Sequence, residues 1–139
     1  MGRINVSRLV MGGLAAGVVA NALDYVINRY LMQAEGEAMM TRLNLSTDVV
    51  ASSVPVWIIV DFIYGMLLVF TYAAMRPRFG AGPKTAAISG GTLWLAICAI
   101  FAGLTAMGIY TGPAFVKSSA LTLVSTMAAS LTGAYLYKE

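Results

Sequence analysis

WIIVDFIYGMLLVFTYAAM, the stretch from Trp57 to Met75, is apolar enough to cross a membrane and contains a single charge, Asp61. Asp61 is the deepest ionisable residue of the sequence, roughly two helical turns or about 10 Å inside its segment. A lone carboxylate at mid-span costs about 3 kcal/mol, so an intramembrane Asp normally faces protein or water and has a partner. On a helix, Asp61 shares one face with Trp57, Tyr64, Gly65, Leu68 and Tyr72. This face is therefore predicted to point into a helix bundle, with two phenols beside the carboxylate.

The composition is that of an integral membrane protein. The 139 residues are 59% hydrophobic and 11% charged, whereas soluble proteins are about 25% charged, and the mean hydropathy is +0.79. Four apolar runs of about 20 residues account for most of the chain. They are predicted at about residues 9–27, 54–75, 85–107 and 114–136. We therefore predict an all-α transmembrane four-helix bundle that forms one domain, residues 1–139.

Basic residues are unevenly divided between the two sides of a four-span arrangement. One side holds Arg3, Arg8, Arg76, Arg78, Lys84 and Lys138, and the other holds Arg29, Arg42 and Lys117. Because cytoplasmic loops carry the excess of Lys and Arg, both termini are predicted to lie in the cytoplasm and the chain in the inner (cytoplasmic) membrane. Residues 28–53 then form an outer loop with one amphipathic helix. Pro55 is expected in the first turn of the second span.

The first span has a polar and glycine-rich face, formed by Gly13, Gly17, Asn21, Asp24 and Asn28. Its GxxxG pattern lets a second helix backbone approach closely. One interpretation is that the glycines pack a neighbouring helix, which Asn21 and Asp24 tie down by hydrogen bonds. The other is that Asp24 and Asp61 converge into an ion or proton site. The candidate intramembrane polar site comprises Asp61, Asp24, Asn21 and Tyr64.

Small and hydroxylated residues line further helix faces in the second, third and fourth spans. In the fourth span they could line a polar path, although hydroxyls that bond their own helix or a neighbour are commoner. The residues predicted to mediate helix packing are Gly13, Gly17, Gly65, Gly91, Gly103, Ser118, Thr122, Ala129 and Gly133.

The sequence offers few groups for chemistry. It has no His and one Cys, Cys98, which excludes an intrachain disulfide and disfavours a haem or zinc site built by this chain alone. No His-containing catalytic set and no phosphate-binding glycine loop is present. We therefore expect no enzyme activity and no cofactor. The net charge of +3 comes without a basic run, so no nucleic-acid partner is expected.

Several motifs together resemble a group of small bacterial four-span membrane proteins to which no function is assigned. They are Arg3-Ile4-Asn5 before Gly12-Gly13-Leu14, Asp24 late in the first span, Arg76-Pro77-Arg78-Phe79-Gly80 between the second and third spans, and the ending Gly133-Ala134-Tyr135-Leu136-Tyr137-Lys138-Glu139. The resemblance covers the whole chain but implies no mechanism. A likeness to the small multidrug exporters stops at architecture, because those carry an essential Glu in the first helix and no Glu lies in a span here.

Three functions remain open from the sequence. The preferred one is an accessory or scaffolding subunit that packs against other membrane subunits or copies of itself. The second is a small proton- or cation-coupled transporter that uses Asp61 and Asp24. The third is a lipid- or pigment-binding subunit, in which Trp57, Trp94 and apolar faces hold the ligand. Membrane lipids are expected partners in each case.

Overall fold

The computed structural model describes residues 4–137, all of whose regular structure is helical. The elements are α1 (Val6–Val26), a π-helical turn η1 (Ile27–Leu31), α2 (Gln33–Arg42), α3 (Thr47–Phe79), α4 (Pro83–Ala106) and α5 (Gly112–Leu136). Within the described residues, four segments are long and apolar enough to cross a membrane: Val6–Leu31, Thr47–Phe79, Pro83–Ala106 and Gly112–Leu136. The prediction of an all-α chain with four apolar helices is confirmed, and it is compatible with a multi-pass membrane protein.

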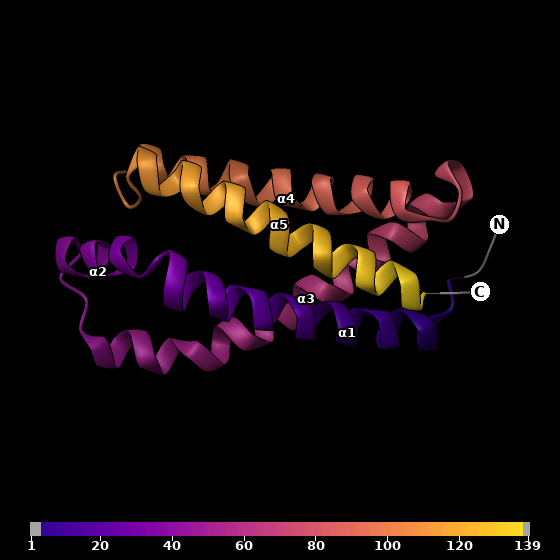
Figure 1. The fold of residues 1–139 in the computed structure, drawn as a ribbon, viewed down its shortest axis with the longest axis horizontal. Helices are drawn as coiled ribbons and strands as arrows, with labels where there is room; N and C mark the ends of the chain where they lie inside the picture. Colours follow the sequence, from indigo (N-terminus) through magenta and orange to yellow (C-terminus); the bar gives the residue numbers. More distant parts are fainter. Residues whose placement is uncertain (1–3, 138–139) are drawn as a thin grey trace.

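The long helices run side by side between two ends of different composition (Figure 1). The start of α1, the end of α5 and the α3–α4 connection lie at one end, here called the terminal end, while α2 and the α4–α5 connection lie at the other, the α2 end. Arg8, Arg76, Arg78 and Lys84 belong to the terminal end. Arg29, Arg42 and Lys117 belong to the α2 end. Arg3 and Lys138, which the topology prediction also used, lie outside the described residues.

Local sequence signals set most helix boundaries. Asn5, Ser46 and Thr111 precede α1, α3 and α5, and each side chain accepts a hydrogen bond from the backbone N–H three residues later, which satisfies one of the free donors of the first turn. α3 ends at Gly80 with φ +82°, and Gly82 precedes α4 with φ +128°. Only glycine adopts such values without strain. The sharp α3–α4 turn is therefore encoded locally.

α3 is longer than predicted, because it begins at Thr47 rather than at about residue 54. Pro55 consequently lies inside the helix, and its placement in the first turn was wrong. The cap at Ser46 starts the helix early. Ser52 and Ser53 then donate hydrogen bonds of 2.9 and 2.7 Å to backbone carbonyls three residues back, just before the proline. At 1.5 Å per residue the 33 residues span about 50 Å, more than the roughly 30 Å of a bilayer core.

The predicted long loop at residues 28–53 is mostly helical. The amphipathic helix expected there is α2, and residues 43–46 alone separate it from α3. η1 joins α1 to α2 almost continuously, so the first apolar segment leads directly into α2. α2 is therefore a nearly direct continuation of the first apolar segment, and no long loop separates it from α1 or α3.

The core lies toward the terminal end and is built largely from small residues. A methyl group added at Gly65 in α3 would lie 2.5 Å from the backbone oxygen of Gly13 and the backbone nitrogen of Gly17. One added at Gly12 would lie 2.7 Å from the carbonyl oxygen of Gly133 in α5. Such distances mean that backbone meets backbone. α1 is thus in close contact with both α3 and α5.

Two tyrosines and an arginine close the terminal end. Tyr72 and Tyr137 pack edge to face with ring centroids 6.2 Å apart, and the Arg76 guanidinium lies over both rings, 5.9 and 5.4 Å from their centroids. The Tyr72 hydroxyl also accepts a 3.1 Å hydrogen bond from the backbone of Gly82. These contacts join the ends of α3 and α5 to the α3–α4 turn.

Candidate functional site: a polar cluster between α1, α3 and α5

Asp24 and Ser125 connect α1 with α5. The Asp24 carboxylate accepts a 2.7 Å hydrogen bond from the Ser125 hydroxyl, and Ser125 is only 4% exposed. A buried hydroxyl that donates to a carboxylate stabilises the charged group in an apolar setting. Asp24 therefore has the kind of partner that an intramembrane acid requires.

Tyr64 and Thr126 make the matching link between α3 and α5. Their hydroxyls lie 3.2 Å apart, and Thr126 is 3% exposed. Because Ser125 and Thr126 are consecutive, α5 presents one hydroxyl to α1 and the next to α3. Three helices thus meet at these bonded side chains. Together with Asp61, which lies one turn before Tyr64 on α3, the residues Asp24, Tyr64, Ser125 and Thr126 are called the polar cluster.

Asn21 ties α1 to α3 beside this cluster. Its side-chain amide donates to the carbonyl of Gly17 in its own helix at 3.0 Å and to the carbonyl of Ile58 at 3.3 Å. Asn21 acts here as a structural clamp, as one interpretation of the sequence proposed. The bond to Ile58 helps to set the position of α3 along the axis of α1.

Asp61 stands apart from these bonds. Its side chain is half-buried, and within residues 4–137 no hydrogen bond or ion pair reaches its carboxylate. The antiparallel register, in which Gly13 faces Met66 and Gly17 faces Phe62, places Asp61 level with position 18 of α1, about 9 Å along the axis from Asp24. The two carboxylates are neighbours without a shared ligand.

The face of α3 that carries Asp61 is buried over only part of its length. Gly65, Leu68 and Tyr72 are buried, but Trp57 is 59% exposed, so the prediction that this whole face points into the bundle was wrong. The reason is that α3 diverges from α4 and α5 toward the α2 end (Figure 1). Of the two phenols expected beside Asp61, only Tyr64 belongs to the polar cluster, because Tyr72 is bonded at the terminal end.

The residues expected to mediate packing fall into three groups. Gly13, Gly17, Gly65 and Gly133 lie in close contacts within the chain, and Ala129 is fully buried. Ser118 and Thr122 donate to carbonyls of their own helix, which disfavours a polar path along α5. A methyl added at Gly91 would lie 3.7 Å from Met127, and one added at Gly103 would have no neighbour within 4 Å.

Trp94, considered above as a ligand-holding residue, joins two helices. Its indole N–H donates a 2.9 Å hydrogen bond to the carbonyl of Ser119 in α5. Trp57 belongs to α3 and is 59% exposed. The lipid- or pigment-binding interpretation stays a prediction.

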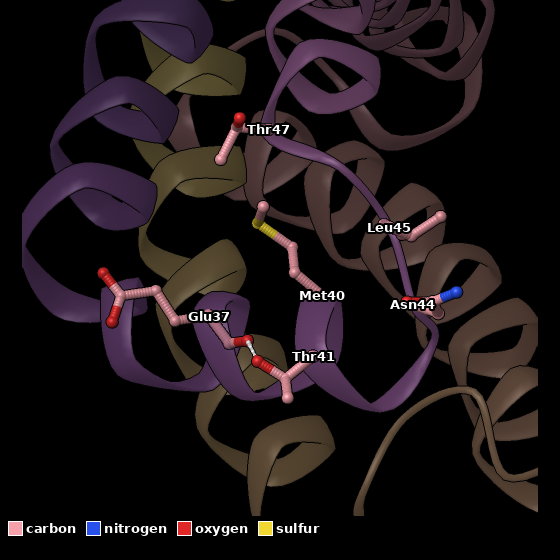
Figure 2. Close-up of a pocket in the computed structure, with 6 residues that line it drawn as sticks. All are labelled: Glu37, Met40, Thr41, Asn44, Leu45 and Thr47. Carbon is pink, nitrogen blue, oxygen red and sulfur yellow. Dashed lines mark hydrogen bonds between the residues drawn. The ribbon is translucent and has the colours of Figure 1, made fainter.

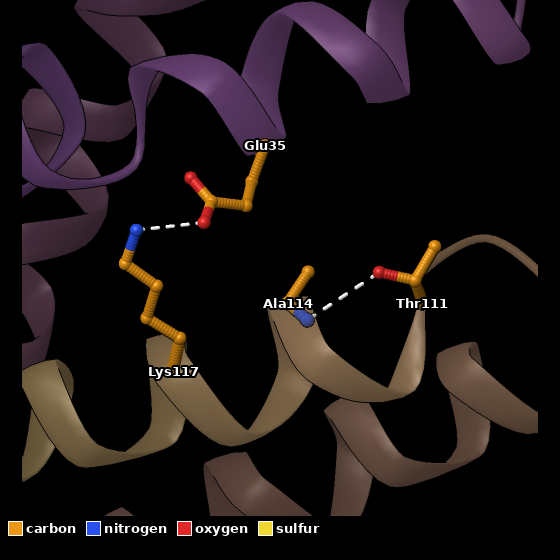
Figure 3. A network of polar contacts seen from close by, with 4 residues as sticks. All are labelled: Glu35, Thr111, Ala114 and Lys117. Atoms are coloured by element: carbon orange, nitrogen blue, oxygen red, sulfur yellow. Dashed lines mark hydrogen bonds and ion pairs between the residues drawn. The ribbon is translucent and has the colours of Figure 1, made fainter.

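A second polar network, which the sequence analysis missed, fastens α2 to the start of α5. Lys117 donates a 2.6 Å hydrogen bond to the Glu35 carboxylate (Figure 3). This hydrogen bond is the main reason why the pKa of Glu35 lies below its usual value. The Arg42 guanidinium bonds the carbonyls of Gly108 and Ile109 in the α4–α5 connection. The Glu35 pair joins residues 82 apart, so no local sequence pattern could have found it.

An open hollow of about 360 Å³ lies where α2 turns into α3 (Figure 2). Glu37, Met40, Thr41, Asn44, Leu45 and Thr47 line it. The Thr41 hydroxyl is already bonded to the Glu37 carbonyl at 3.0 Å. None of the lining residues belongs to the polar cluster, so the hollow is not an entrance to Asp61.

Metal binding finds no support in the part of the chain that the structure describes. No group of three or more His, Cys, Asp or Glu residues is placed there so as to hold a metal ion. Comparison of the chain with protein-family models, with curated proteins and with solved structures found no match.

Proposed function

We propose that this chain is an accessory or scaffolding subunit of a larger inner-membrane complex, and that it contacts its neighbour through residues 47–63, the distal half of α3. The observation that carries the proposal is Asp61. It is a partly exposed carboxylate about two helical turns inside the apolar stretch of α3, and nothing within residues 4–137 bonds it. Lipid tails offer it no donor, so an intramembrane acid in this position requires a partner.

The surface around Asp61 is suited to a second helix. Trp57 and Ile58, one turn before Asp61 on the same side of α3, are 59% and 44% exposed, so a large aromatic and a branched side chain flank the carboxylate. Interfaces commonly combine a large aromatic anchor with a small number of polar contacts. The glycine faces are already occupied within the chain, which is why we place the partner at α3 and not at Gly13 and Gly17.

The orientation in the membrane is part of the same proposal. The terminal end, with Arg8, Arg76, Arg78 and Lys84, is placed in the cytoplasm because of the excess of positive charge there. α2 then lies outside. Labelling of single cysteines at Ala81 and at Gly36 with a membrane-impermeant reagent, in a Cys98→Ala background, tests this: intact cells should label position 36 alone.

Photo-crosslinking from α3 tests the proposed contact. Trp57 and Phe70 are both exposed aromatic residues of α3, 59% and 49% exposed, but only Trp57 lies in the distal half. A photoreactive phenylalanine derivative at position 57 should crosslink to another protein in native membranes, and the same group at position 70 should not. Mass spectrometry of the product identifies the neighbour.

A native gel of the mild-detergent extract gives the independent measurement. Migration with a larger complex, together with a crosslink from position 57, supports the accessory role. A band that contains this chain alone, with no crosslink from position 57, overturns it.

Proton- or cation-coupled transport is the second candidate. The observation that favours it is that the adjoining helices α1 and α3 carry two carboxylates about 9 Å apart along the helix axis, one of them bonded to a buried hydroxyl. Reconstituted vesicles with a pH-sensitive dye test this role. Asp61→Asn should then abolish proton movement and leave the assembly intact. Flux that is unchanged by the substitution would exclude the role of Asp61.

A further inference from the structure

Within residues 4–137, no Lys or Arg lies level with Asp61. Along α3, Arg76 is 15 residues away, about 22 Å. On α1, the position level with Asp61 is residue 18, which is ten residues from Arg8 and eleven from Arg29, about 15 to 16 Å. On α5, the register set by Asp24 and Ser125 puts Lys117 about 21 Å away, and Lys117 is paired with Glu35. No cation of the part of the chain that the structure describes reaches the carboxylate.

A second copy of the chain would not supply one either. A two-fold axis along the membrane normal places each residue of one copy at the same depth in the other. At the depth of Asp61 the copy offers a second Asp61 of like charge, and Tyr64, whose hydroxyl is engaged with Thr126. Self-association through the distal half of α3 would therefore leave the carboxylate without an opposite charge.

We infer that the distal half of α3 docks a transmembrane helix of a different protein that carries a Lys or Arg at mid-membrane depth, paired with Asp61. This inference rests on the accessory role proposed above and names the chemistry of the partner. Intramembrane charges pair with one another, and a Lys or Arg of a neighbouring helix would balance the charge of the Asp61 carboxylate while leaving it ionised. Trp57 is one turn from Asp61 on the same face, where its exposed ring can cover the apolar stem of a Lys or Arg and attract its charge.

Synthetic helices test the charge requirement directly. The full-length protein is placed in phosphatidylcholine vesicles with polyleucine transmembrane peptides that carry Lys, Gln or Leu at the centre, or Lys near one end. Energy transfer between labelled peptide and protein measures association. We expect the central-Lys peptide to bind about tenfold more tightly than the central-Leu peptide, within the range of intramembrane polar contacts. The Gln and terminal-Lys peptides should gain much less.

Matched variants assign the effect to Asp61. Asp61→Asn keeps the size and hydrogen-bonding capacity of the side chain and should abolish the preference for central Lys. Asp48→Asn removes a carboxylate from the first turn of the same helix and should leave the preference intact. Asp61→Lys should reverse it in favour of a peptide with a central Asp. Asp61→Asn alone decides the question if Asp61→Lys does not fold, and a single gel-filtration peak verifies folding.

Equal binding of the central-Lys and central-Leu peptides would overturn the inference, as would a preference that survives Asp61→Asn. The accessory role fails separately. A native partner that crosslinks to position 57 but has no Lys or Arg at mid-span would leave that role standing and reject the charge pairing. The absence of any partner on the native gel and in crosslinking would reject the role itself.

Discussion

The terminal half of the bundle and its α2-end half are held together by different forces. In the terminal half the helices touch through small residues, and Ala16, Leu68 and Ala129 are completely buried. Toward the α2 end Trp57 is 59% and Ile100 is 64% exposed. Lipid provides no hydrophobic driving force between helices, so close backbone packing stabilises the terminal half through dispersion energy. The terminal half is thus the structural base of the chain.

Hydrogen bonds and one ion pair replace packing toward the α2 end. Asn21 holds α3 at Ile58, Arg42 holds the α4–α5 connection, and Glu35 holds Lys117. Polar ties of this kind are weaker singly than a packed core and respond to pH and salt. Substitutions in the two halves are therefore expected to destabilise the protein by different mechanisms.

The largest effect is expected where α1 meets α3. Gly65→Val places a branched side chain 2.5 Å from backbone atoms of Gly13 and Gly17, so the helices must separate. Overpacking of this kind costs about 3 kcal/mol or more. Gly103→Val is the matched control, because nothing lies within 4 Å of an added methyl group there. Thermal unfolding in detergent, followed by circular dichroism, should show a large loss for the first variant and a small one for the second.

Equal midpoints for the two valine variants would contradict the assignment of the core to the terminal half. A Gly65 variant that folds normally but no longer binds a native partner would instead indicate that the partner contacts the glycine face.

An intermediate effect is expected at the polar cluster, where the two halves meet. Ser125→Ala leaves the Asp24 carboxylate without its 2.7 Å donor, which should lower the free energy of unfolding by about 1 to 2 kcal/mol. Ser118→Ala removes a hydroxyl that bonds only its own helix, so about 0.5 kcal/mol or less is expected. Denaturant titration in mixed micelles compares the two. A larger loss at Ser118 would contradict the importance of the Asp24 bond.

The features that depend on composition and on residue spacing within one helix could be predicted from the sequence. Apolar runs predicted the four long helices, and the GxxxG at Gly13 and Gly17 predicted a close helix contact. Both signals are local, since they depend on residues within one helix. The sequence could not show that the glycine face would be filled by α3 of the same chain, because any helix backbone fits such a face.

The failures at Pro55 and Trp57 have physical reasons. A proline after an apolar boundary suggests a first turn, but the earlier cap at Ser46 started the helix sooner. Helical periodicity placed Trp57 with Tyr72 on one face, and this is correct, but periodicity does not tell where a neighbouring helix diverges. The position of α2 depends on residues far apart in the chain, such as Glu35 and Lys117, which single-sequence patterns do not connect.

The smallest effect is expected at the tie between α2 and α5, where acidification should loosen one contact. The hydrogen bond from Lys117 lowers the pKa of Glu35 below its ordinary value of 4.5. A group whose pKa is depressed in the folded state stabilises it above the unfolded pKa, and this contribution disappears as the pH falls through the lowered value. The tie should therefore be intact at pH 7 and weaken below about pH 4.5.

Spin labels at Ala38 and Ala120, both exposed, measure this tie in a Cys98→Ala background. Their distance distribution should broaden slightly below pH 4.5 and in about 1 M salt, which screens exposed charges. Glu35→Gln should give the broadened distribution already at pH 7 and remove the pH response. Because Arg42 still bonds the α4–α5 connection, α2 should stay attached. Full detachment in Glu35→Gln would mean that the ion pair, and not Arg42, carries the attachment of α2.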